Sequence, residues 1–216
     1  NLAADYLTAG GFTEIMSNSL TKESYYEGLT SYPAARCVRI LNPLSADLNV
    51  MRQTLLFNTM EAVQLNANRR NGNLRLYEFG NCYFYDEAAR DAEKLLSAYS
   101  EQYRLAIAVT GAAVPQSWNA KPQASSFFTL RAVAEKLLRR FGLDIYALKC
   151  EPLQSDLFGD GISLSAGNGK ELLQMGVVAS RIRRAFDLKQ EVYYLEMNFD
   201  ALVKSTRKHR IAFEEL

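Results

Sequence analysis

Residues 103–110, YRLAIAVT, carry apolar side chains at both odd and even positions. A strand with one face in water alternates apolar and polar residues, whereas a strand covered on both faces does not. This run therefore predicts an interior β-strand. A chain that contains such a strand needs a sheet with a covering layer on each side.

Two helices are predicted to supply that cover. Over residues 53–69 the main apolar positions are spaced by four, three and four, so they share one helical face: Leu56, Met60, Val63 and Ala67. Phe57 and Leu65 lie off that stripe, so this helix is expected to contact a second body as well as a core. Residues 127–141 form the other helix, with a serine before it and Gly142 after it as favoured caps.

Strand-like runs fill much of the remaining chain. The longest spans residues 74–85, with Gly80 as a candidate bulge, and others are expected at 12–20, 37–41, 145–150, 161–166, 172–179 and 191–198. Short helices are expected at 1–10, 180–186 and 199–204, and loops at 86–101 and 111–126. The order lacks a strict βαβ rhythm. It predicts an α+β fold, a mainly antiparallel sheet flanked by helices.

Charge and composition exclude several classes of protein. The 25 Lys+Arg and 24 Asp+Glu nearly cancel, which excludes a polyanion-binding tail but not a local basic patch. No apolar run reaches about 18 residues, so we expect no membrane partner. With one histidine, His209, and three separated cysteines, we predict no metal site. Free thiols are typical of a cytoplasmic protein.

Several short motifs occur in a fixed order between residues 37 and 84. They are NPLS (42–45), MRQTLL (51–56), NANRR (66–70) and LRLYEFG (74–80). Downstream, the order continues with Trp118, FFTL (127–130), MGVV (175–178) and YLEMNF (194–199). This combination resembles class II aminoacyl-tRNA synthetases, and more narrowly the catalytic-like region of bacterial phenylalanyl-tRNA synthetase β subunits.

The resemblance implies a class II synthetase-like fold within a longer, multidomain β subunit. Such a subunit pairs with a catalytic α subunit in a cytoplasmic (αβ)₂ enzyme that attaches phenylalanine to its tRNA. ATP and Mg²⁺ would be bound by the α subunit, and no cofactor by this fragment. The chain does not begin with Met and opens inside a helical pattern. We therefore expect residues 1–216 to be one catalytic-like domain excised from that subunit.

The spacing of two charged residues bears on catalysis. A working class II site needs Arg-x-Glu in its motif 2 strand, because residues two apart point to the same side. Arg75 and Glu78 are three apart, so a regular strand places them on opposite faces. The family's Gly-rich third motif is also absent. We interpret the pair as a degenerate motif 2 and predict no catalytic residue; an active adenylate-forming class II enzyme is the alternative.

The segment that corresponds to the family's motif 1 is expected to contact the α subunit. The predicted contacts are Asn49, Met51, Arg52, Leu55, Leu56, Thr59, Met60 and Val63. For each of them the alternative is a core position, because apolar residues at helical spacing more often face a core.

Direct tRNA binding is a further alternative. The candidate contacts are Arg69, Arg70, Arg181, Arg183 and Arg184, and residues 204–210 add four more cationic side chains. Such residues can contact phosphates. Surface arginines on a nearly neutral domain are nevertheless more often solvated, and no platform of interleaved aromatic and basic residues is visible.

Overall fold

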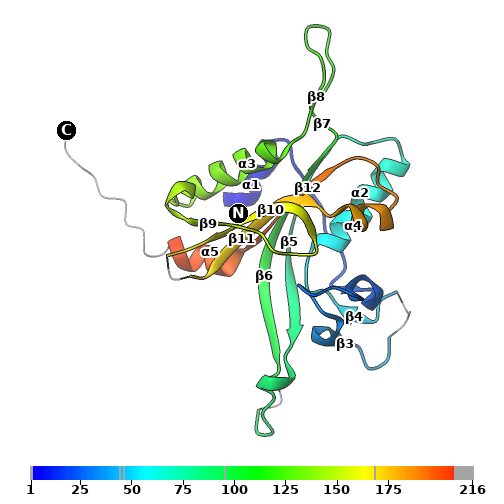
Figure 1. The fold of residues 1–216 in the computed structure, drawn as a ribbon, viewed down its shortest axis with the longest axis vertical. Helices are drawn as coiled ribbons and strands as arrows, with labels where there is room; N and C mark the ends of the chain where they lie inside the picture. The colour runs from blue at the N-terminus through cyan, green and yellow to red at the C-terminus, as the bar shows by residue number, and fades with distance from the viewer. Residues whose placement is uncertain (1, 44, 46, 95, 168, 207–216) are drawn as a thin grey trace, which may run out of the picture.

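A seven-stranded sheet forms the centre of the computed structural model, which describes residues 2–43, 45, 47–94, 96–167 and 169–206. Figure 1 shows the sheet, whose strands follow the order β1-β5-β6-β12-β11-β10-β9. Their bounds are β1 Thr13–Glu14, β5 Leu74–Tyr85, β6 Tyr99–Thr110, β12 Val192–Asn198, β11 Glu171–Val178, β10 Phe158–Ser165 and β9 Lys149–Pro152. Only β1 and β5 pair in parallel; the other pairs in this sheet are antiparallel. The predicted α+β class with a mainly antiparallel sheet is confirmed.

Helices cover both faces of this sheet. One face packs against α1 (Leu2–Ala9), α3 (Phe127–Arg140) and α5 (Phe199–Thr206). Its buried side chains are all apolar apart from a tyrosine hydroxyl, and we call it the apolar face: Tyr77, Leu105, Ile107, Val109, Leu164, Leu173, Met175, Leu195 and Met197. The strand predicted to be interior thus has cover on both sides, as its composition requires.

The opposite face packs against α2 (Leu56–Asn68) and α4 (Ser180–Ala185). It also meets a small sheet in the order β2-β4-β3, with β2 Leu20–Thr21, β4 Val50–Met51 and β3 Val38–Arg39. We call it the mixed face, because apolar and charged side chains are buried together on it: Leu76, Glu78, Cys82, Phe84, Arg104, Ala106, Tyr194 and Glu196.

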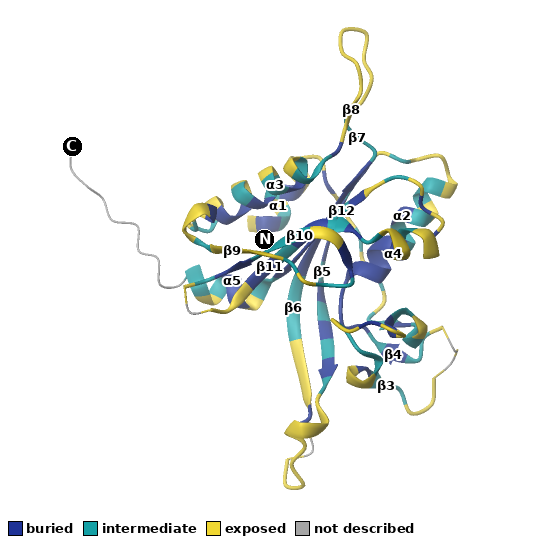
Figure 2. Cartoon of the chain, in the orientation of Figure 1, coloured by how far each residue is buried: buried dark blue, intermediate teal, exposed yellow. Residues whose placement is uncertain are grey.

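Two hairpins project from opposite ends of the body, as Figures 1 and 2 show. At one end β5 and β6 continue together beyond the core, and at the other β7 (Ala112–Val114) and β8 (Gln123–Ala124) form a thin arm. Four short 3₁₀ turns complete the described chain: η1 Glu23–Tyr26, η2 Ala34–Arg36, η3 Glu87–Ala89 and η4 Ile145–Ala147.

Local chemistry explains the best-predicted helix. Ser126 and Thr129 form a reciprocal capping box at the start of α3. At its end, Gly142 has a φ of 75°, and the amide of Leu143 bonds back to the carbonyl of Leu138. This is a glycine-terminated helix end of the kind that the sequence predicts.

Several predicted elements differ from the structure. The strand expected at 12–20 shortens to β1, because its later residues turn towards Glu78. The strand expected at 145–150 is a 3₁₀ turn followed by β9, and the loop expected at 111–126 contains a hairpin. Gly80 forms no bulge, since β5 and β6 pair in one continuous register.

Candidate functional site

Strand β5 places its two charged motif residues on opposite sides. Its register with β6 runs from Leu74 to Tyr85 without a shift, so successive side chains alternate between faces. Arg75 shares a face with Tyr77, and Glu78 shares the mixed face with Leu76. The opposite placement predicted from the spacing is confirmed. These two side chains cannot converge on one ligand.

Glu78 is buried in an ion pair on the mixed face. Arg52 Nη1 donates to its carboxylate at 2.8 Å, and the Ser17 hydroxyl lies 2.7 Å from both carboxylate oxygens. Arg52 Nε also donates to the carbonyl of Asn81 at 3.0 Å. A β-carbon at Gly80 would collide with the Arg52 guanidinium, so glycine is needed for this approach. The carboxylate is engaged within the chain.

Arg75 is used differently. Its Nη2 donates to the carbonyl of Ala113 at 2.5 Å, and its Nη1 to that of Gly10 at 3.4 Å. These carbonyls belong to the root of the β7–β8 arm and to the end of α1. The arginine therefore joins three segments of the backbone.

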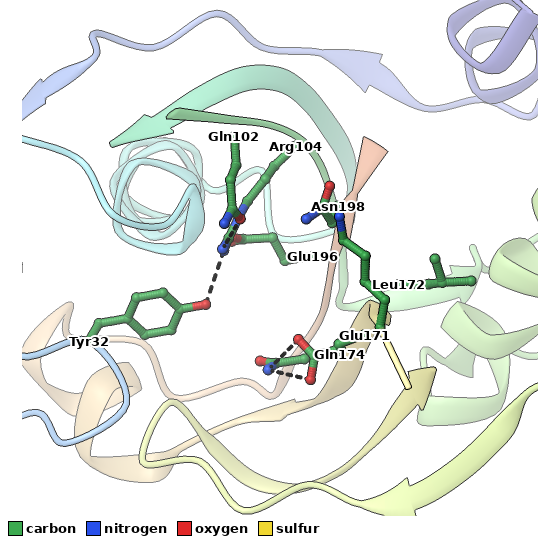
Figure 3. Close-up of a pocket in the computed structure, with 9 residues that line it drawn as sticks. Tyr32, Gln102, Arg104, Glu171, Leu172, Gln174, Glu196 and Asn198 are labelled. Atoms are coloured by element: carbon green, nitrogen blue, oxygen red, sulfur yellow. Dashed lines mark hydrogen bonds and ion pairs between the residues drawn. The ribbon is translucent and has the colours of Figure 1, made fainter. Parts of the chain in front are cut away.

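A polar cavity of about 270 Å³ opens on the mixed face, the face of the sheet that also carries Glu78. Figure 3 shows its lining: Tyr32, Gln102, Arg104, Lys170, Glu171, Leu172, Gln174, Glu196 and Asn198. Its lining carries a buried carboxylate, an arginine and a tyrosine hydroxyl from three different segments. It is therefore our candidate functional site.

The buried charges of this cavity are already paired. Arg104 forms an ion pair with Glu196 and donates to the Tyr32 hydroxyl at 3.0 Å and to Gln102 at 2.8 Å. Burial lowers the pKa of Arg104, but Tyr32 and Glu196 outweigh it and raise that pKa well above its ordinary value. Burial raises the pKa of Tyr32 to about 12. The guanidinium stays charged and the phenol neutral, and their bonds are made inside the chain.

Glu196 connects the cavity to the start of α2. One of its oxygens accepts from the Thr54 hydroxyl at 2.6 Å, the Leu55 amide at 3.1 Å and the Tyr194 hydroxyl at 2.5 Å. A carboxylate is favoured near a helix N-terminus. Burial keeps the pKa of Tyr194 well above its ordinary value, so its hydroxyl remains a donor. Glu196 thus fixes a helix to the sheet.

The structure corrects most of the predicted α-subunit contacts. Six of the eight residues are 3% exposed or less and lie in this chain's own core: Arg52, Leu55, Leu56, Thr59, Met60 and Val63. A side chain without exposed surface cannot contact another chain, so the core alternative holds for these six. Asn49 and Met51 stay partly exposed. The helix also begins at Leu56 rather than at 53.

The predicted tRNA contacts lie along one edge of the molecule. Arg69, Arg70, Arg181 and Arg184 are exposed. Arg183 is half-buried and donates to the carbonyls of Val178 and Gln190, so it is committed to this chain. His209 and residues 207–210 of the basic stretch lie outside the described residues, as does Leu44 of the NPLS motif.

Sequence reasoning missed the residues that organise the mixed face: Ser17, Tyr32, Arg104 and Glu196. One signal was present, since Glu196 interrupts an apolar strand between Leu195 and Met197. A charge inside a buried strand requires a partner. That partner, Arg104, is remote in sequence, so the pairing could not be derived from the pattern.

The described residues have two further features. They contain no group of three or more His, Cys, Asp or Glu side chains arranged to hold a metal ion. None of their helices has the length and apolar character needed to cross a membrane. The three cysteines are free thiols.

Comparison with known proteins identifies relatives of the whole chain. Residues 1–199 match the family described as "Phenylalanyl tRNA synthetase beta chain CLM domain". The chain is 44% identical over 216 residues to the phenylalanine–tRNA ligase β subunit of Bacteroides thetaiotaomicron. It is 37% identical over 215 residues to that of Porphyromonas gingivalis. In both cases the match covers 100% of this chain but 26% of the relative, so the chain spans about a quarter of their length.

Among solved structures, the fold matches a pyrrolysyl-tRNA synthetase from Desulfitobacterium hafniense. The TM-score is 0.69 at 15% identity, over 95% of this chain and 66% of that one. At this identity the match shows the fold alone. The class II synthetase-like fold implied by the sequence motifs is confirmed.

Proposed function

This chain belongs to the phenylalanyl-tRNA synthetase β chain CLM domain family, and we propose that it is a non-catalytic structural module of a ligase β subunit. In this proposal it packs on the catalytic α subunit of an (αβ)₂ enzyme in the cytoplasm that attaches phenylalanine to tRNA. ATP and Mg²⁺ are bound by the α subunit. The relatives' names supply the ligase and the β subunit, and the other parts of the proposal follow from the resemblance of the sequence motifs.

One observation carries the non-catalytic part of the proposal. Arg75 and Glu78 face opposite sides of the sheet, and each is engaged within the chain. An adenylating site needs an arginine that is free to meet the charge developing on the α-phosphate. The Arg104 guanidinium in the cavity is likewise occupied by Glu196, Tyr32 and Gln102.

The contact with the α subunit needs a surface that this chain leaves open. After the correction above, the small sheet β2-β4-β3 supplies it. Asn49 and Met51 are partly exposed there, and Leu41 is 97% exposed. The Ile40 amide bonds to the Asn49 carbonyl, so Leu41 adjoins that residue. We propose this small sheet as the site of packing, in place of the buried stripe of α2.

Gel filtration with light scattering, of the β subunit with and without its cognate α subunit, tests the proposal. We expect a stable complex, and weaker assembly when Leu41 and Met51 are both replaced by Glu. The matched control is Leu96→Glu, which changes a leucine that is 77% exposed on the far hairpin. Absence of a complex from a folded subunit would contradict the packing role. Phenylalanine-dependent pyrophosphate exchange by this chain without the α subunit would contradict the non-catalytic role.

A second candidate function, tRNA contact, is favoured by the joining of two arginine-bearing segments. Gln64 Nε2 on α2 donates to the Phe186 carbonyl, and Gln190 Nε2 donates to the Gly72 carbonyl. These bonds hold the end of α2, with Arg69 and Arg70, beside the segment after α4. If the arginines contact phosphates, replacing both Arg69 and Arg70 by Gln lowers tRNA affinity and reduces the salt slope by about 2. An unchanged slope would contradict this role.

A further inference from the structure

The β7–β8 arm, residues 111–124, projects from the body where β6 ends (Figure 1). Its outer part, residues 114–124, is exposed throughout, as Figure 2 shows. Trp118, the chain's one tryptophan, is 97% exposed within it. A two-stranded hairpin is marginally stable on its own, and an exposed indole gains nothing from folding. The exposed tryptophan therefore suggests that the arm acts by contacting something outside the folded body.

The tip of the arm is ordered by its own bonds. The Ser117 amide donates to the Ala120 carbonyl at 3.1 Å, which closes a turn around Trp118. The Ser117 hydroxyl donates to the Asn119 side-chain oxygen at 2.8 Å. Prolines at positions 115 and 122 restrict the two limbs. These bonds order the backbone of the turn that carries the indole, which lowers the entropy that this backbone loses on binding.

The root of the arm is fastened to β5. Arg75 donates to the Ala113 carbonyl, and Asn73 accepts from the Ala112 amide at 2.8 Å. Gly111 has a φ of 73°, and a β-carbon there would collide with the carbonyl of Gly72. The direction in which the arm leaves the body is therefore set by the neighbouring strand, with Arg75 making the charged contact.

We propose that this arm is a docking element whose Trp118 inserts into an apolar pocket on the α subunit. Arg75 is the positioning residue that holds the arm at its angle. The inference rests on the proposed function, since it takes the α subunit as the partner. It concerns a surface other than the small sheet with Met51 and the adjoining loop with Leu41.

Charge selects a protein pocket over the other occupants. Between residues 111 and 126 the one charged side chain is Lys121, and binding to an RNA backbone needs several cations. Two arms packed tip to tip would bring Lys121 beside its own copy, with no carboxylate on either arm. The partner chemistry that fits is an apolar pocket with a carboxylate beside Lys121.

The surface at the root of the arm extends the same contact. A cavity of about 390 Å³ there is lined by Gly111, Ala112, Pro122, Ala124, Ser125, Gln190, Glu191 and Tyr193. Its wall is formed largely by small apolar residues and a tyrosine ring, with Glu191 as its one charged member. An apolar side chain from the partner would fill it, and a partner cation would meet Glu191.

The affinity of the α subunit for β-subunit variants tests the inference. We expect Trp118→Ala to weaken assembly about 30-fold or more, the scale on which buried interface tryptophans act. Tyr146→Ala is the matched control, because Tyr146 is 70% exposed on η4, and it should change the affinity less than twofold. Circular dichroism of each variant checks that the body stays folded.

Each outcome decides between the two proposals. If the wild-type subunits assemble and Trp118→Ala does so equally well, the docking role of the arm is overturned while the packing role stands. If the wild-type subunits do not assemble, both are overturned. If Trp118→Ala weakens tRNA binding by the β subunit alone, or its self-association, the arm has another occupant and the inference is overturned.

A double-mutant cycle separates positioning from general stability. Arg75→Met should weaken assembly when Trp118 is present and have little further effect on Trp118→Ala, because Arg75 acts through the arm. Hydrogen exchange should also show faster exchange of the Ala112 amide in Arg75→Met. Additive effects of the two substitutions would overturn the role of Arg75.

Discussion

The two faces of the central sheet are built from the same strands but stabilised in different ways. On the apolar face, α1, α3 and α5 cover side chains such as Leu105 and Leu195 that make no ionic contact. On the mixed face, two arginine–carboxylate pairs lie among apolar residues, the fully buried Arg52–Glu78 and the partly buried Arg104–Glu196. The stability of the mixed face therefore depends on the geometry of specific bonds, whereas that of the apolar face depends on packed volume and buried apolar area.

This difference bears on function. Buried ion pairs contribute little net stability relative to well-packed apolar residues, yet removing one partner is costly. The pairs occupy the face on which Glu78 of the degenerate motif lies. Their charges hold Ser17 and the start of α2 against the sheet and join β6 to β12, so they are engaged within the chain.

The largest effect is expected from breaking a pair on the mixed face. Glu78→Ala leaves the Arg52 charge buried without a counter-charge and should lower the free energy of unfolding by about 3–5 kcal/mol. Urea denaturation followed by circular dichroism measures this loss. The double variant Arg52→Met/Glu78→Leu is the control, and it should recover most of the loss because no lone charge remains. A loss below about 1 kcal/mol for Glu78→Ala would contradict the exclusion of water from the Arg52–Glu78 pair.

A smaller effect is expected from truncating the apolar face. Leu137 on α3 is fully buried, so Leu137→Ala should cost about 2–5 kcal/mol through lost burial and a residual cavity. Leu137→Met keeps the volume and should cost less than about 1.5 kcal/mol. The matched substitution on the mixed face, Glu78→Gln, also keeps the volume but still removes the charge. If Glu78→Gln lowers the free energy of unfolding by no more than Leu137→Met does, the contrast between the faces is wrong.

The smallest effect is expected at Asp156, which lies between β9 and β10 and holds the loop that precedes Tyr32. Thr30 and Ser31 donate to its carboxylate, at 2.5 Å from the Thr30 amide. Burial would raise the pKa of Asp156, but these hydrogen bonds outweigh it and hold the pKa below its ordinary value. The stabilisation is therefore present above the unfolded pKa of about 4 and is lost as the pH falls through the lower folded value.

Asp156→Asn should consequently cost less than about 1 kcal/mol at pH 7, because the side chain is half-buried and solvent screens part of the interaction. The difference from the wild type should shrink as the pH falls below about 4. Unfolding curves at pH 2 to 7 for both proteins measure it. A difference that grows towards low pH would contradict the direction of the pKa shift.

Local sequence patterns predicted the elements whose signals are local. The box at Ser126 and the glycine at position 142 mark the two ends of α3, and residues 74–85 form the predicted strand in full. The spacing of Arg75 and Glu78 gave their opposite placement, because alternation is a property of any regular strand. The ordered motifs also led to the correct family and fold.

Six of the eight predicted α-subunit contacts were wrong, although the helical pattern behind them was correct. The pattern did not show which part of the structure covers the apolar stripe. The stripe containing Met60 and Val63 is a helical face, and it packs on this chain's own sheet. Periodicity shows that a face is covered; it does not show by what. The same limit hid the arm at 111–124, whose polar residues predict a loop whether or not its root is fastened.

The sequence by itself determined the alternation of strands, the helical stripes and the spacing that separates Arg75 from Glu78, since each depends on neighbours along the chain. Tertiary structure alone decided which charges meet. Arg104 and Glu196 stand 92 positions apart, and Arg52 and Glu78 stand 26 apart. Such pairs form only when the covering elements pack on the sheet and exclude water, and no local pattern encodes which distant group will then be within hydrogen-bond distance.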